Sequence, residues 1–144
     1  KAMSDESRYY RFMDTLRELT QTMLVRFTQI DYDREMALVA ILPPQEEGGK
    51  EIQVGVSRYV VNPDGESVEF ALAVGDDWQK CGVGRKLMTA LIDCACQKGY
   101  RAVIGDVLST NSKMFRLMTS LGFSIHPHPD DTAVKRVVKP LTGG

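Results

Sequence analysis

The stretch that decides the fold reads Leu72-Ala73-Val74-Gly75-Asp76-Asp77-Trp78-Gln79-Lys80-Cys81-Gly82-Val83-Gly84-Arg85-Lys86-Leu87-Met88. An apolar, β-branched run gives way to a short polar loop and then to apolar residues at helical spacing. Within the loop, Gln79, Gly82 and Gly84 form the pattern Gln-x-x-Gly-x-Gly. Glycines let a backbone approach a phosphate closely, and the first N–H groups of a helix have no partner inside it. The stretch therefore predicts a strand, an anion-binding loop and a helix, and a diphosphate fits such a loop.

Two other interpretations of this loop remain open from its residues. Glycines between a strand and a helix also occur in tight turns that only permit close packing. Lys80, Arg85 and Lys86 favour the anion-binding interpretation, because they add positive charge beside the same turn. Dinucleotide-binding and nucleoside-triphosphate loops fit less well, because the chain has neither Gly-x-Gly-x-x-Gly nor Gly-Lys followed by Ser or Thr here.

The segments around this stretch predict helices first, then a meander of strands, then helices and strands in alternation. Apolar spacing predicts a helix over residues 7–20 and a second short helix over 21–27. We expect strands at residues 35–42, 52–56, 59–61, 68–74, 102–108, 123–125 and 133–138, a turn at 62–65, and helices at 83–98 and 111–121. This order predicts an α/β (α+β) fold with a mixed sheet.

Length and composition limit the possible functions. The 144 residues suffice for a single domain with one core. With 18 basic and 19 acidic residues spread along the chain, no field favours nucleic acid. No apolar run approaches the roughly 20 residues that cross a bilayer, and the N-terminus lacks a secretory pattern, so a cytoplasmic location is expected. The three cysteines show no paired framework and no metal-ligand spacing, which favours reduced thiols and no bound metal.

The central half of the chain resembles the GNAT family of N-acetyltransferases. The resemblance covers residues 54–125: a strand ending Ala71-Leu72-Ala73-Val74, the glycine loop, the amphipathic helix, Asn111, and Leu121-Gly122-Phe123. It implies the GNAT fold, in which a mostly antiparallel sheet contains a splayed strand pair that binds the cosubstrate acetyl-CoA. The implied cofactor-binding residues are Leu72, Ala73 and Val74 for the pantetheine arm, Gln79, Lys80, Cys81, Gly82, Val83, Gly84 and Arg85 for the diphosphate, and Asn111, Met114 and Met118 on the next helix. Asn111 also fits an N-cap of that helix.

Glu69 is the expected catalytic residue. Side chains alternate along a strand, so Glu69 shares a face with Ala71 and Ala73, opposite Val68 and Phe70. The Glu69 carboxylate would also fit a strand face that is simply exposed to solvent. The resemblance to the GNAT family, however, implies that Glu69 is the general base. An amine with a pKa of about 10.4 needs such a base at neutral pH. We expect a backbone N–H near Val74 to stabilise the oxyanion.

The sequence departs from the family where many members carry a tyrosine that protonates the departing thiolate. Met118 occupies that position. A thiol pKa of about 8.5 makes the thiolate a tolerable leaving group without an acid. Asp106, Ser109, Ser112 and Tyr100 are the reserve candidates for the acid.

A wider resemblance, through residues 7–12, 26–40 and 76–79, is to bacterial protein lysine acetyltransferases in which this domain follows a region similar to acyl-CoA synthetases. It implies a protein substrate, an AMP-forming acyl-CoA synthetase such as acetyl-CoA synthetase. It also implies a domain excised from the C-terminal end of a larger protein, without the family's first strand, whose segment at residues 9–12 lines the acceptor groove. Oligomeric state and acyl-chain preference stay open.

Two alternative functions remain open. Acetylation of a small amine would favour a closed acidic pocket, whereas the acidic residues here are spread along the chain. A non-catalytic acetyl-CoA sensor would explain the loss of the tyrosine at Met118. A Glu69→Ala variant separates enzyme from sensor, because an enzyme would keep its affinity for the cofactor and lose transfer.

Overall fold

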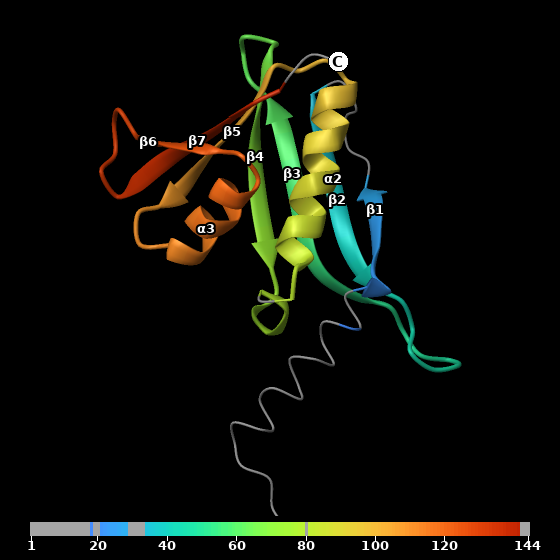
Figure 1. Cartoon of the computed structure of the whole chain (residues 1–144). Coiled ribbons are helices and arrows are strands. Elements are labelled where there is room, and N and C mark those ends of the chain that lie inside the picture. Colours follow the sequence, from blue (N-terminus) through green and yellow to red (C-terminus); the bar gives the residue numbers. More distant parts are fainter. Residues whose placement is uncertain (1–17, 19–20, 29–33, 80, 142–144) are drawn as a thin grey trace, which may run out of the picture.

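A single seven-stranded sheet organises the chain. The computed structural model describes residues 18, 21–28, 34–79 and 81–141, and its strands lie in the order β1-β2-β3-β4-β5-β7-β6 (Figure 1). Neighbours are antiparallel except β4 and β5, which are parallel. The strands are β1 (Leu24–Thr28), β2 (Glu35–Leu42), β3 (Ile52–Val61), β4 (Ser67–Val74), β5 (Ala102–Leu108), β6 (Ser124–Pro127) and β7 (Val134–Pro140), and the helices are α2 (Val83–Gln97) and α3 (Ser112–Ser120). The expected α/β fold with a mixed sheet is confirmed.

Helix α2 packs against the sheet through one apolar stripe. It contacts β2, β3 and β4 (Figure 1), and its buried residues are Val83, Leu87, Met88, Leu91 and Ala95. Burial of each larger apolar side chain stabilises the fold by about 1.5–3 kcal/mol. Gly99 follows the helix with φ +86°, as a terminating glycine does. The first turn of the helix lies beside the end of β4, because the Cβ position of Gly84 is 3.7 Å from Val74 Cγ2.

Strand β1 corrects one prediction. The short helix expected over residues 21–27 is wrong, because Leu24–Thr28 pair antiparallel with β2, from Leu24 opposite Ile41 to Thr28 opposite Ala37. Short apolar runs fit either element, and here the open edge of β2 supplies the backbone partners. The expected helix over residues 7–20 and the aromatic segment at 9–12 lie outside the described residues, apart from Glu18.

Strands β4 and β5 diverge after a short paired segment. They pair at Ser67, Val68 and Glu69 of β4, and Glu69 lies opposite Ile104 of β5. Beyond this point β4 runs on to Val74 without pairing to β5. The splayed strand pair expected from the sequence is therefore present.

The two faces of β4 differ as expected. Val68 and Phe70 are buried, and Leu72 is half-buried on the same face, toward α2. Glu69 and Ala71 are exposed on the opposite face. None of the helices in the described ranges combines the length and apolar composition needed to cross a membrane.

Candidate functional site

The loop between β4 and α2 holds the start of the helix open toward solvent. Residues Asp76–Trp78 form a single 3₁₀ turn, and Gly82 is the N-cap residue of α2 with φ +88°, a conformation that favours glycine. The Lys86 N–H donates to the Gly82 carbonyl over 3.1 Å. The N–H groups that precede Lys86 belong to the first turn, which has no acceptors within the helix. With no acidic residue in this turn, the helix dipole favours an anion here.

Gly84 lets three elements meet at this point. A Cβ on Gly84 would lie 3.3 Å from Leu117 Cδ2 of α3, 3.6 Å from Leu72 Cδ2 and 3.7 Å from Val74 Cγ2 of β4. A side chain there would fill the space between the helices and the strand. The glycine therefore keeps α3 and β4 close to the first turn of α2.

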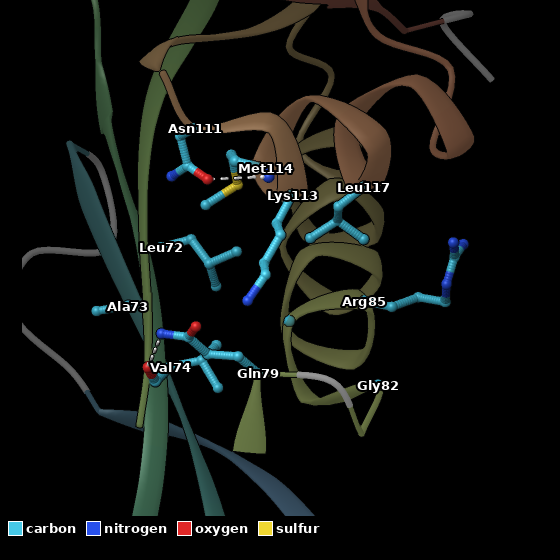
Figure 2. A pocket seen from close by; sticks show the side chains of 11 residues that line it. Leu72, Ala73, Val74, Gln79, Gly82, Arg85, Asn111, Lys113, Met114 and Leu117 are labelled. Atoms are coloured by element: carbon cyan, nitrogen blue, oxygen red, sulfur yellow. Dashed lines mark hydrogen bonds between the residues drawn. The ribbon is translucent and has the colours of Figure 1, made fainter. Parts of the chain in front are cut away.

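These elements surround a cleft of about 450 Å³ (Figure 2). The end of β4, the glycine loop and the first turns of α2 and α3 form its walls. Its lining residues are Leu72, Ala73, Val74, Gln79, Gly82, Gly84, Arg85, Asn111, Lys113, Met114 and Leu117. The structure thus gathers most of the residues that the sequence singled out for the cofactor.

Backbone groups at the edge of β4 face this cleft. The Gly75 N–H donates to the Val54 carbonyl of β3 over 2.8 Å, and backbone groups alternate in direction along a strand. Leu72 and Val74 therefore present their N–H and C=O groups to the opposite edge, where β5 has diverged. The Val74 carbonyl accepts a hydrogen bond from Gln79 Nε2 over 3.2 Å. Within the described part of the chain neither backbone group of Leu72 is paired, so both face the cleft as possible partners for an extended ligand.

Asn111 is confirmed as an N-cap. Its Oδ1 accepts from the Met114 N–H over 3.2 Å (Figure 2), which satisfies one donor at the start of α3. The cap fixes the first turn of α3 where Met114 lines the cleft.

Several of the predicted contact residues point elsewhere. The side chains of Val83 and Met118 are fully buried in the core, and Cys81 is only 7% exposed beside Trp78. None of the three side chains lines the cleft, so any contact of Cys81 or Val83 with a ligand would come from the backbone. Lys80 lies outside the described residues.

The positive charges also differ from expectation. Arg85 lines the cleft, but its guanidinium group donates through Nη2 to Ser120 Oγ over 2.5 Å and points away from the cleft (Figure 2). Lys86 donates through Nζ to the Met23 carbonyl over 2.8 Å. Lys113, which the sequence reasoning missed, extends into the cleft (Figure 2). The sequence does hold a signal for Lys113, because this residue lies two positions after Asn111, the N-cap of the helix that borders the cleft.

Glu69 lies in a second, smaller hollow rather than in the cleft. This hollow, of about 280 Å³, is lined by Asn62, Pro63, Asp64, Ser67, Glu69, Ile104 and Arg136. Asp64 accepts hydrogen bonds from the backbone N–H groups of Glu66 and Ser67, which lower the pKa of its carboxyl. The hollow therefore brings the carboxyl groups of Asp64 and Glu69 together with the Arg136 guanidinium, beside the last paired residues of β4 and β5.

The reserve candidates for the general acid line neither the cleft nor the hollow around Glu69. Asp106 pairs with Arg136 Nε over 3.3 Å. Ser109 Oγ donates to the Thr132 carbonyl, and the Tyr100 ring packs edge-on against Tyr59. Ser112 begins α3. Among these four residues the structure singles out no proton donor.

Comparison with known proteins identifies the family. Residues 4–123 match the model of the acetyltransferase (GNAT) family. The chain is 33% identical over 130 residues to an acetyltransferase of Pseudomonas aeruginosa, covering 90% of this chain and 68% of that protein. It is 32% identical over 120 residues to the acetyltransferase Pat of Mycolicibacterium smegmatis, covering 83% of this chain and only 34% of that protein.

A solved structure shows the same fold. The GNAT domain of S. lividans PAT superposes with a TM-score of 0.65 at 24% identity, covering 96% of this chain and 79% of that chain. The family uses acetyl-CoA as its acetyl donor. From the family match and the divergent strands beside a glycine-rich helix start, the chain belongs to the GNAT family and is an acetyl-CoA-dependent N-acetyltransferase.

Proposed function

We propose that the protein transfers the acetyl group of acetyl-CoA to a lysine side chain of a protein, with an AMP-forming acyl-CoA synthetase as the substrate. The observation that carries the cofactor part of this proposal is the cleft where the free edge of β4 meets the first turn of α2. The likeness to Pat supports a protein acceptor. The cytoplasmic location expected from the sequence belongs to the same proposal.

In this proposal the cofactor lies along the cleft. The backbone N–H groups around Gly82 and Gly84 hold its diphosphate, because they face the ligand with the positive end of the helix dipole. The pantetheine arm runs along β4 and donates a hydrogen bond to the free backbone carbonyl of Leu72, which leaves the Leu72 N–H for the thioester. The thioester then lies toward the point where β4 and β5 diverge, near Glu69.

Glu69 serves as the general base in this arrangement. Its carboxylate, on the exposed face of β4 at the divergence, takes a proton from the incoming ammonium group, directly or through a water. The amine nitrogen then attacks the thioester carbon, and the carbon–sulfur bond breaks with the electron pair leaving on sulfur. A pKa of about 8.5 lets the thiolate depart without a dedicated acid.

The geometry favours Leu72 over Val74 as the oxyanion donor. At about 3.3 Å per residue along a strand, Val74 lies roughly 16 Å from Glu69, too far for both groups to act on one carbonyl. The Leu72 N–H lies about 10 Å from Glu69 along the strand, a gap that the acceptor amine and a water span. It also faces the edge from which β5 has diverged.

Transfer from labelled acetyl-CoA to a panel of purified acyl-CoA synthetases tests the proposal. We expect label on one lysine of a synthetase with the wild-type chain, and loss of transfer with unchanged cofactor affinity for Glu69→Gln. Glu66→Gln is the matched control, because Glu66 is an exposed glutamate in the turn before β4 that lines neither hollow. Label only on small amines, or full activity of Glu69→Gln, would contradict the proposal.

A further inference from the structure

Among the basic side chains described near the glycine loop, Lys113 points into the cleft (Figure 2). Anion sites at helix starts are commonly completed by a basic side chain that forms charge-assisted hydrogen bonds. The Arg85 guanidinium donates to Ser120 Oγ on the side away from the cleft, and Lys86 donates to the Met23 carbonyl. Of the basic side chains that the structure describes around the loop, Lys113 alone extends into the cleft (Figure 2).

The position of Lys113 follows from how α3 is docked. Asn111 caps the helix, and Leu117 lies one turn beyond Lys113 on the same side, with its Cδ2 3.3 Å from the Cβ position of Gly84. This contact places Leu117 of α3 beside the first turn of α2. Lys113 therefore faces the start of α2 across the cleft, with its ammonium group between Leu72 and the glycine loop (Figure 2).

The ammonium group of Lys113 is available for a ligand. Among the described residues, no carboxylate lies within salt-bridge distance of it, and none forms a hydrogen bond with it. The stem lies beside Leu72 and Leu117, apolar residues that line the same cleft. A mobile, hydrated ammonium gains most from a multiply charged partner such as a phosphate.

We propose that Lys113 clamps the diphosphate of acetyl-CoA against the first turn of α2. This inference rests on the proposed function and adds the residue that closes the diphosphate site. The backbone amides of α2 bind the diphosphate from one side, and the Lys113 ammonium binds it from α3 on the other side. The diphosphate, rather than the 3′-phosphate, is the partner because Lys113 shares the cleft with Gly82 and Gly84.

The test compares two ligands and two variants by calorimetric titration. Acetyl-CoA and 3′-dephospho-acetyl-CoA both carry the diphosphate but differ in the 3′-phosphate. Lys113→Gln keeps a polar end group on the side chain and removes the charge. Arg116→Ala is the matched control, because Arg116 is an exposed basic residue of α3 that does not line the cleft.

We expect Lys113→Gln to weaken binding of both ligands equally, by about tenfold to a hundredfold, as for loss of a hydrogen bond to a charged group. Arg116→Ala should change neither affinity, and thermal unfolding of both variants should match the wild type. Lys113→Arg should restore part of the loss.

Three results would overturn this inference. They are an unchanged affinity of Lys113→Gln for acetyl-CoA, a loss confined to the ligand with the 3′-phosphate, and an equal loss in Arg116→Ala. A wild-type chain that binds neither ligand would overturn the proposed function as well, which distinguishes that failure from a failure of Lys113 alone.

Discussion

Replacing Gly105 with alanine would test how β4 and β5 are held where they diverge. A Cβ on Gly105 would lie 2.2 Å from Phe70 Cε1 and 2.7 Å from Cδ1 and Cζ of the same ring. Ordinary carbon contacts are about 3.5–4.0 Å, so the ring would have to move by more than about 1 Å. Phe70 is buried and packs against Phe123, with ring centroids 5.6 Å apart, which leaves the ring little room.

The expected loss in the free energy of unfolding of Gly105→Ala follows from two opposing effects. Overpacking of a core by a methyl group costs about 1–3 kcal/mol, and the overlap at Gly105 places this site near the upper end. Replacing glycine in a strand regains about 0.5–1 kcal/mol of backbone entropy. The net loss is therefore about 2 kcal/mol in the free energy of unfolding, or roughly 4–8 °C in Tm for a chain of this size.

Urea denaturation of Gly105→Ala, with Phe70→Leu as the second change, is the assay. Leucine lacks Cε1 and Cζ, two of the three ring atoms that overlap, including the one that lies 2.2 Å away. The double variant should therefore lose about 1–2 kcal/mol less than the sum of the single losses. A Gly105→Ala variant within about 0.5 kcal/mol of wild type, or strictly additive losses, would refute this packing argument.

Further variants address the base, the cap and the loop. Glu69→Gln should lower kcat by about 10²–10⁴-fold, with activity recovering toward high pH as the amine loses its proton unaided; a pH–rate profile checks this, and a flat profile contradicts it. Asn111→Ala should cost about 1 kcal/mol of stability through the lost bond to the Met114 N–H, measured by urea denaturation. Gly82→Ala should cost about 1–2 kcal/mol because φ is +88°, in the same assay. Hydrogen bonds lower the pKa of Asp64, so its stabilisation is present above the unfolded pKa of about 3.9 and is lost as pH falls through the folded value; Asp64→Asn should flatten that acid-side decline in Tm, and an unchanged decline would argue against the assignment.

Local patterns in the sequence are sufficient to predict the strand, the loop and the helix α2 that build the cleft. The apolar stripe of α2 and Gly99 determine that helix almost to the residue, because both signals are local. Alternation along β4 separated Glu69 from Phe70 for the same reason. Gln79, Gly82 and Gly84 were recognisable as a loop pattern that the structure places on the cleft.

Features that depend on distant contacts were not predictable in this way. β1 is a strand because β2 offers a free edge, and nothing within residues 21–28 decides this. Lys113 reaches the cleft only because Leu117 docks α3 against Gly84. Arg85 and Lys86 lie beside the loop in sequence, yet their side chains find Ser120 and Met23 instead.

Backbone amide NMR during a titration with CoA tests the central claim most directly. If the first turn of α2 holds the diphosphate, the amide resonances of Gly82, Val83, Gly84 and Arg85 should show the largest saturable shifts, with the Leu72 amide responding to the pantetheine arm. Resonances of these amides that stay in place at saturating CoA, or that move no more than those of β6, would contradict it.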